Sequence, residues 1–283
     1  MKLFQTGPDR YHGATPPAAD RYATINQRQL TFFVGLVALG LPTILIVGAF
    51  NPFLETCFRH SISHYYYAPF WGAPFIGALI FIGTYMLVYR GETAAEAKLS
   101  SLAGFFAFGV ALFPTSGYGC DETAFVARAI VTFGPAPEAL DLIKVPPRDG
   151  LPDLVAYFEL TPWSATVHYT SAMLLFSFLA WFALVIFTAA EPHQINPDKS
   201  YTRNKQIRNS FYILCGSVMI LCILAMGAYA VVAHLTTLDV GWWNANHMTF
   251  WCEAVALWAF GLSWMVKGRF GGVIFNDPVE RAA

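Results

Sequence analysis

Charged side chains are scarce in this sequence. Lysine, arginine, aspartate and glutamate make up 12% of the 283 residues, whereas hydrophobic residues make up 56%. Soluble domains carry about 25% charged residues, so this composition excludes an ordinary soluble protein and indicates an integral membrane protein. The formal net charge is −1, and without an excess of basic residues we expect no nucleic-acid partner.

Several functional signatures are also missing. The sequence contains no HExxH, GxSxG or CxxC motif and no glycine-rich nucleotide loop between a strand and a helix. A cleavable secretory signal is not expected either, because residues 1–29 are polar and contain three prolines. We expect these residues to form a cytoplasmic N-terminal arm, followed by a first apolar run that is retained as a membrane span.

Long apolar runs follow this arm. A helix needs about 20 apolar residues to cross the hydrocarbon layer, and six segments meet or approach this length. They are Leu30 to Phe50, Tyr66 to Tyr89, Leu99 to Phe113, Ser164 to Ala190, Ser210 to Leu235 and Trp242 to Val266. The third must include part of the preceding GETAAEAKLS to cross, and prolines delay the helical start of the second. The sequence therefore predicts an all-α fold with six transmembrane helices over residues 30–266.

Lysine and arginine residues predict the orientation. They concentrate in the N-terminal arm, after the second span, after the fourth span and in the tail, residues 267–283. Short loops rich in these residues stay in the cytoplasm. Six spans put these four segments on one side, so we expect both termini in the cytoplasm (N-in/C-in) and the protein in the bacterial inner (plasma) membrane.

The longest connection, residues 114–163, falls on the outer side and is expected to be partly structured. Within it, ETAFVARAIVTFG and LPDLVAYFEL have helical spacing of apolar positions. We therefore predict a partly helical outer loop that forms a small lid. Cys57 and Cys120 both fall in outer loops, where an oxidising compartment allows a disulfide; spacing alone leaves both the bridge and two free thiols open. Cys215, Cys222 and Cys252 are expected to be small buried hydrophobes.

Polar residues at the outer ends of the spans are the candidate functional groups. Two stripes at helical spacing stand out, Ser164, His168 and Ser171 in the fourth span and Asn246, Thr249 and Glu253 in the sixth. Glu253 is an ionisable residue inside an apolar helix. Such residues usually face the protein interior and serve a function, although a structural hydrogen bond is the alternative.

Five histidines map to the same outer level: His60, His64, His168, His234 and His247. One interpretation is that those near tyrosines and tryptophans simply belong to the aromatic belt at the membrane surface. The other is a metal site, for which three imidazoles suit Zn²⁺ best. The set to test is His64, His168 and His247 as ligands, with Glu253 or Asp121 as base or supporting carboxylate.

The stretch SISHYYYAPFWGAPFIGALIFIGTYMLVYRG, together with the later LAGFFAFGVALFPT, resembles a family of uncharacterised bacterial membrane proteins of the DUF998 or Frag1/DRAM type. The resemblance covers residues 61–115 and implies about six spans but no known reaction. A second comparison is with alkaline ceramidases and adiponectin receptors, which carry S-x-x-x-H and H-x-x-x-H motifs in seven spans. Here His64 stands at a different spacing from Ser61 and Ser63, and the last span has His247 alone, so this comparison only defines an alternative.

Three functions remain open from the sequence. The first is a non-enzymatic membrane protein with an outward-facing His/carboxylate pocket, which binds a lipid or small molecule or acts as an accessory subunit of a membrane complex. The second is a metal-dependent hydrolase of membrane lipids, in which Zn²⁺ activates water and Glu253 or Asp121 accepts the proton. The third is a proton-coupled transporter that uses Glu253.

Overall fold

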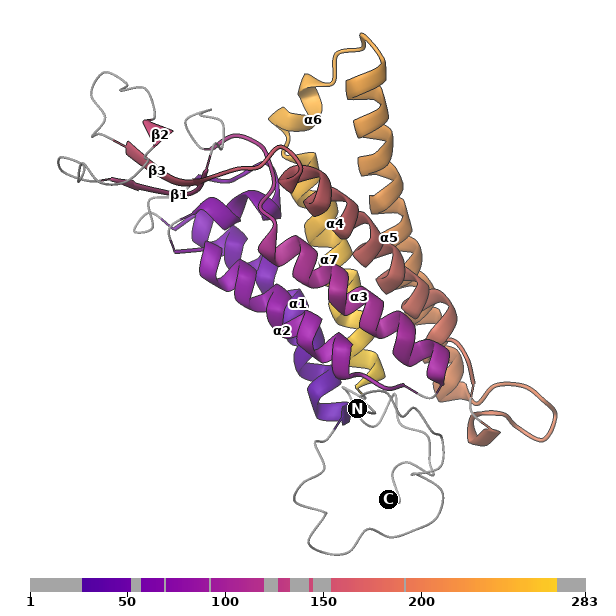
Figure 1. The fold of residues 1–283 in the computed structure, drawn as a ribbon. Helices are drawn as coiled ribbons and strands as arrows, with labels where there is room; N and C mark the ends of the chain where they lie inside the picture. The colour runs from indigo at the N-terminus through magenta and orange to yellow at the C-terminus, as the bar shows by residue number, and fades with distance from the viewer. Residues whose placement is uncertain are drawn as a thin grey trace, which may run out of the picture.

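The computed structural model describes residues 27–51, 57–68, 70–91, 93–119, 127–132, 143–144, 154–190 and 192–268. Its long helices are α1 (Gln27–Ala49), α2 (Gly72–Val88), α3 (Ala94–Leu112), α4 (Ser164–Trp181), α5 (Arg203–Leu235) and α7 (Met248–Lys267). The shorter elements are the 3-10 helix η3 (Ile62–Tyr67), the π-helical turn η4 (Phe182–Ile186) that continues α4, η5 (Pro192–Gln194) and α6 (Gly241–Ala245). Figure 1 shows the long helices as one bundle.

Five of these helices are long and apolar enough to cross a membrane: α1, α3, α4 with η4, α5 and α7. The helix α2 is also apolar but has 17 residues. The protein is therefore a helical, membrane-embedded protein, as the composition predicted.

The helices form a closed ring in chain order. Each helix from α1 to α5 packs against the next, and α7 returns to pack against both α1 and α5. The helices α1 and α7 approach closely, because a Cβ atom on Gly35 would meet the carbonyl oxygen of Gly261, and one on Gly261 would meet that of Gly35. Small residues at such crossings allow helix backbones to touch in membranes.

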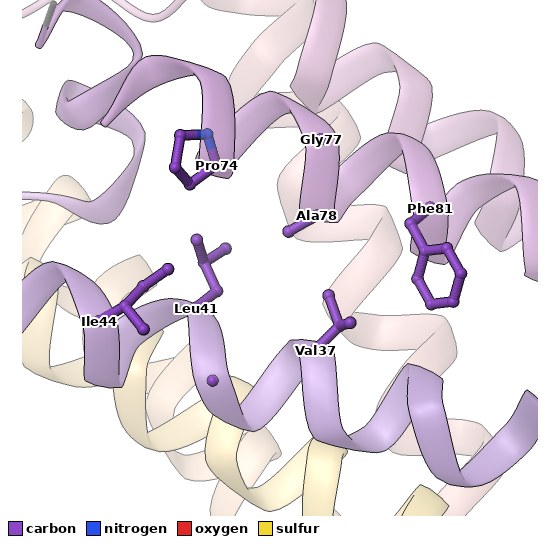
Figure 2. A pocket seen from close by; sticks show the side chains of 8 residues that line it. Val37, Leu41, Ile44, Pro74, Gly77, Ala78 and Phe81 are labelled. Carbon is purple, nitrogen blue, oxygen red and sulfur yellow. The ribbon is translucent and has the colours of Figure 1, made fainter. Parts of the chain in front are cut away.

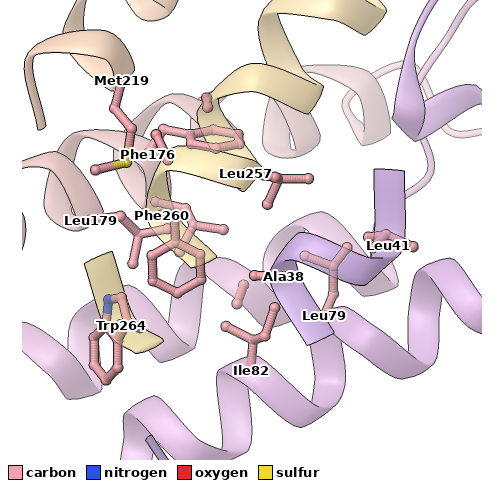
Figure 3. Packing of buried hydrophobic residues seen from close by; sticks show 14 of the residues in the cluster. Ala38, Leu41, Leu79, Ile82, Phe176, Leu179, Met219, Leu257, Phe260 and Trp264 are labelled. Carbon is pink, nitrogen blue, oxygen red and sulfur yellow. The ribbon is translucent and has the colours of Figure 1, made fainter. Parts of the chain in front are cut away.

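The core of the bundle is built around α7. Trp264 is completely buried, and its ring packs against Tyr85, Tyr89, Phe182 and Phe187 at centroid distances of 5.3 to 6.1 Å. Figure 3 shows the continuation of this cluster through aliphatic side chains of several helices. This packing fixes the relative positions of the helices that carry the polar residues described below.

The predicted boundaries hold for some spans and fail for the last one. The helix α3 begins at Ala94 inside the charged approach, where the hydroxyl of Thr93 caps it by accepting a hydrogen bond from the Glu96 N–H at 3.1 Å. The helix α2 begins at Gly72, later than Tyr66, in agreement with the expected delay. The predicted sixth span, however, is interrupted: α6 ends at Ala245, His247 has a left-handed backbone (φ 51°), and α7 starts at Met248.

The long connection between α3 and α4 corrects a second prediction. Its described parts include three β-strands, β1 (Ala127–Thr132), β2 (Ile143–Lys144) and β3 (Leu154–Glu159), where two amphipathic helical pieces were expected. They form an antiparallel sheet in the order β1-β3-β2, with Ala127 opposite Glu159 and Thr132 opposite Leu154. Periodicity does not identify short apolar runs reliably, and here backbone pairing between distant segments determines the conformation.

Figure 1 places this sheet at the α6 end of the bundle, opposite the end where α1 begins and α7 finishes. The element η3 lies at the sheet end, because it contacts β1 and immediately precedes α2. The predicted polar residues of α4 and α7 therefore meet η3 at one end of the bundle.

Candidate functional site

The segment 61–67 is a short helix inserted between the ends of the long ones. Ser61 caps η3, since its hydroxyl accepts a hydrogen bond from the Ser63 N–H at 3.1 Å. Ile62, Ser63 and Tyr65 are all buried. This stretch therefore does more than anchor a helix at the membrane surface, because half of it faces the protein interior.

Glu253, on α7, holds the start of η3. Its carboxylate accepts hydrogen bonds from the Ser61 hydroxyl at 2.8 and 3.0 Å and from the Ile62 N–H at 2.7 Å. All of these groups donate, so a carboxylate without a proton satisfies them. An acidic side chain in an apolar helix is expected to have a polar partner. For Glu253 this partner is η3, through the Ser61 hydroxyl and the Ile62 N–H.

His168, on α4, holds the next turn of η3. Its Nδ1 lies 2.7 Å from the carbonyl oxygen of Phe113, and its Nε2 lies 2.9 Å from the Ser63 hydroxyl. Because a carbonyl can only accept, Nδ1 carries the proton and Nε2 accepts a hydrogen bond from Ser63. Glu253 and His168 therefore hold η3 from two different helices.

The polar stripe predicted on α4 is confirmed as one buried face. Ser164, His168 and Ser171 are all buried, and the Ser164 hydroxyl donates to the carbonyl of Pro114 at 2.8 Å. The stripe predicted on the last span, Asn246, Thr249 and Glu253, does not act together, because its members have separate partners. Thr249 accepts a hydrogen bond from the indole of Trp243 at 2.8 Å and Asn246 bonds to the carbonyl of Trp242, so only Glu253 reaches η3.

His64 packs against the chain that follows α3. A Cβ atom on Gly117 (φ +152°) would collide with the His64 imidazole. Burial, with contributions from His60 and Arg59, lowers the pKa of His64 to about 4. The imidazole of His64 is therefore neutral at physiological pH.

His247 pairs with His60. The two rings stack at a centroid distance of 4.6 Å, and the His60 Nδ1 lies 3.0 Å from the carbonyl oxygen of Asn244. Burial and the neighbouring His60 lower the pKa of His247. The backbone also joins this pair to the bundle, because the Phe250 N–H donates to the carbonyl of His60 at 2.9 Å.

Two of the predicted zinc ligands, His168 and His247, have other partners in the structure. His168 uses both ring nitrogens in hydrogen bonds, and His247 stacks on His60. Within the described ranges, no three histidine, cysteine, aspartate or glutamate side chains are grouped so that they could hold a metal ion. Asp121 lies outside the described residues. The zinc site stays a prediction, without a ligand set in the part of the chain that the structure describes.

The sequence interpretation missed Ser61 and Ser63 as the partners of Glu253 and His168. The available signal was Ser61 itself, because serine is a preferred N-cap residue. It also missed the pairing of His60 with His247, because no periodicity relates two segments so far apart in the chain.

The predictions for the cysteines are partly confirmed. Cys57 is disulfide-bonded, while its predicted partner Cys120 lies outside the described residues. Cys215 and Cys222 are free and buried, as predicted for small hydrophobes, and Cys252 is free and partly buried.

The chain matches no protein-family model, no curated protein and no solved structure. The resemblance of residues 61–115 to DUF998 or Frag1/DRAM-type proteins therefore stays a prediction.

Proposed function

We propose that the chain is a six-span protein of the bacterial inner membrane with both termini in the cytoplasm. The short helix α2 would be the sixth span. Supporting this orientation, the end of the bundle where α1 begins and α7 finishes carries more basic residues in the described segments, namely Arg90, Lys98, Lys199, Arg203, Lys205 and Lys267, than the other end, which has Arg59, Arg128 in β1 and Lys144 in β2. The more basic side of a membrane protein faces the cytoplasm.

We further propose that the protein binds the anionic head group of a lipid, or a small anionic molecule, at the η3 site. We define the η3 site as Ser61, Ser63, His64, His168 and Glu253. The observation that carries this proposal is that Glu253 and His168, on separate helices, both converge on η3. Buried polar groups are costly in a membrane and are typical of binding sites.

The Glu253 carboxylate is already occupied by hydrogen bonds from Ser61 and Ile62, and the positive group beside η3, Arg59, favours an anion there. Arg59 lies over the Tyr65 ring, with its guanidinium carbon 5.8 Å from the ring centroid, and it interacts electrostatically with His64. His60 and His247 add two imidazoles at the same end of the bundle. An arginine is suited to a phosphate or carboxylate group.

Lipid binding can be tested on the purified protein by native mass spectrometry with phosphatidylglycerol and phosphatidylcholine. We expect phosphatidylglycerol to bind more tightly, and Arg59→Gln to weaken this binding by about tenfold, which corresponds to about 1.4 kcal/mol. Arg203→Gln is the matched control, because Arg203 is exposed at the opposite end of the bundle. Equal binding of the two lipids, or equal effects of the two substitutions, would contradict an anion site at η3.

One observation favours a second candidate, an acyl hydrolase. The Ser63 hydroxyl, the Nε2 of His168 and the carbonyl of Phe113 that orients the ring are arranged like a nucleophile, its base and the group that positions the base. His168 would take the Ser63 proton as the oxygen attacks an ester carbonyl, and would return it to the leaving alcohol. This arrangement uses His168 as a base and not as a zinc ligand.

The hydrolase candidate predicts that a fluorophosphonate probe labels Ser63 and that a chelator leaves the labelling unchanged. Ser63→Ala should abolish the labelling. Ser177→Ala should not, because Ser177 is exposed and bonds only to the carbonyl of Met173. A protein that takes up no probe at Ser63 would leave anion binding as the proposed function.

A further inference from the structure

The helices α1 and α2 touch near both of their ends. Near the η3 end, the ring of Trp71 packs directly on Gly48, at a place where a Cβ atom would overlap it. Near the other end, the hydroxyls of Thr31 and Tyr85 lie 2.5 Å apart in a buried hydrogen bond. Both contacts are between groups of little freedom, so the two helices are fixed at two separated points.

Between these contacts the two helices leave a groove of about 350 Å³. Figure 2 shows side chains from both helices pointing into it, with Val37, Leu41 and Ile44 on one side and Pro74, Ala78 and Phe81 on the other. Gly40 and Gly77 complete the lining. A Cβ atom on either glycine would have no neighbouring atom within 4 Å, so the space above both is open.

The groove opens away from the bundle. Ile44 and Phe81 are partly exposed at its edges, whereas Leu41 is 2% exposed at its base. None of the eight lining residues has a polar side chain. Because α1 is long and apolar enough to span a membrane, the surroundings of this groove are lipid hydrocarbon and not water.

We propose that this groove binds one acyl chain of a membrane lipid. An apolar cavity of about 150 Å³ is large enough to hold a benzene molecule, so a groove of this size has room for a segment of hydrocarbon chain. An acyl chain is the apolar ligand that the membrane supplies around the helices. The site is separate from the η3 site and does not depend on the function proposed for it.

The dimensions of the groove argue against a helix from a second copy of the chain. The lining residues on α1 extend from Val37 to Ile44, about 10 Å along the helix axis at 1.5 Å per residue. A helix with its side chains is also about 10 Å wide. Since the contacts at Gly48 and Thr31 close both ends, no helix can lie along the groove, and one that crosses it would insert little more than a side chain.

A photoactivatable fatty acid with a mid-chain diazirine provides the test, with the full-length protein in lipid nanodiscs. We expect strong labelling of the peptides that contain residues 37–44 and 74–81. Filling the groove with Gly40→Leu and Gly77→Leu should reduce this labelling by about tenfold, equivalent to about 1.4 kcal/mol of binding free energy.

Gly227→Leu is the matched control. Gly227 lies on α5 and is exposed, and a Cβ atom there also has no neighbour within 4 Å, but it does not line the groove. This substitution should leave the labelling of α1 and α2 unchanged. Thermal unfolding of each variant shows whether it remains folded.

Two results would overturn the proposal. Labelling of equal strength on every lipid-facing helix would mean that the groove holds no chain more firmly than the rest of the surface. A cross-link between the grooves of two copies, formed by a bifunctional reagent in nanodiscs without the fatty acid, would mean that a second chain covers this face.

Discussion

The backbone N–H of Ile62 donates a hydrogen bond of 2.7 Å to the carboxylate of Glu253, 191 residues further along the chain. The Ser61 hydroxyl donates to the same carboxylate. One acidic side chain therefore determines where the segment between α1 and α2 enters the bundle.

Removing this carboxylate should destabilise the protein. Glu253→Ala leaves the Ser61 hydroxyl and the Ile62 N–H without their acceptor, at about 1 to 3 kcal/mol for each buried donor. Glu253→Gln keeps one acceptor oxygen and should cost less. Thermal unfolding in detergent, followed by tryptophan fluorescence, gives the order wild type, Gln, Ala. If Ala were as stable as wild type, Glu253 would not hold η3.

Ser63 and His168 should be energetically coupled. Each single substitution, Ser63→Ala or His168→Phe, removes the bond between the hydroxyl and Nε2, so the double variant should lose less stability than the sum of the two. We expect a coupling of about 1 kcal/mol, typical of a buried hydrogen bond. Ser177→Ala combined with His168→Phe provides the additive control, because Ser177 bonds elsewhere. Strict additivity for Ser63 and His168 would contradict their interaction.

Acid should weaken the folded state through His64. Its pKa is about 4 in the folded protein and about 6.5 in an unfolded chain, so the unfolded state binds the proton more readily. The stabilising contribution is complete above pH 6.5 and is lost as the pH falls from about 6.5 to about 4. The nearby Arg59, His60 and His168 act in the same direction.

The comparison for this effect is between unfolding temperatures at pH 7 and pH 5. His64→Asn should reduce the loss of stability on acidification, because it removes the group that takes up the proton. His234→Asn, at the exposed end of α5, should leave the loss as it is in wild type. An identical acid response in wild type and His64→Asn would exclude His64 as its source.

Two glycines of α1 provide a matched pair for helix packing. Gly35→Ala places a methyl group against the carbonyl oxygen of Gly261 and should cost about 1 to 3 kcal/mol through overpacking. Gly40→Ala meets nothing within 4 Å and should stabilise the helix by about 0.5 to 1 kcal/mol. Unfolding temperatures of the two variants should therefore move in opposite directions. A shift in the same direction would contradict the close contact of α1 with α7.

The sequence was sufficient for the features that depend on local composition. The apolar runs predicted the helices, the shortness of the third run predicted that α3 starts inside GETAAEAKLS, and the spacing of Ser164, His168 and Ser171 predicted a single polar stripe on α4. These properties arise within one helix, where positions repeat every 3.6 residues, so they are visible in the order of the amino acids.

Only the tertiary structure decided which polar groups meet. Glu253 pairs with Ser61 and Ile62, His168 with Ser63 and Phe113, and His60 with His247, each across a large part of the chain. The pairing of β1 with β3, which replaced the predicted helices, is also non-local. Such contacts depend on how the helices pack against one another, and a sequence pattern within one segment contains no information about its neighbours in space.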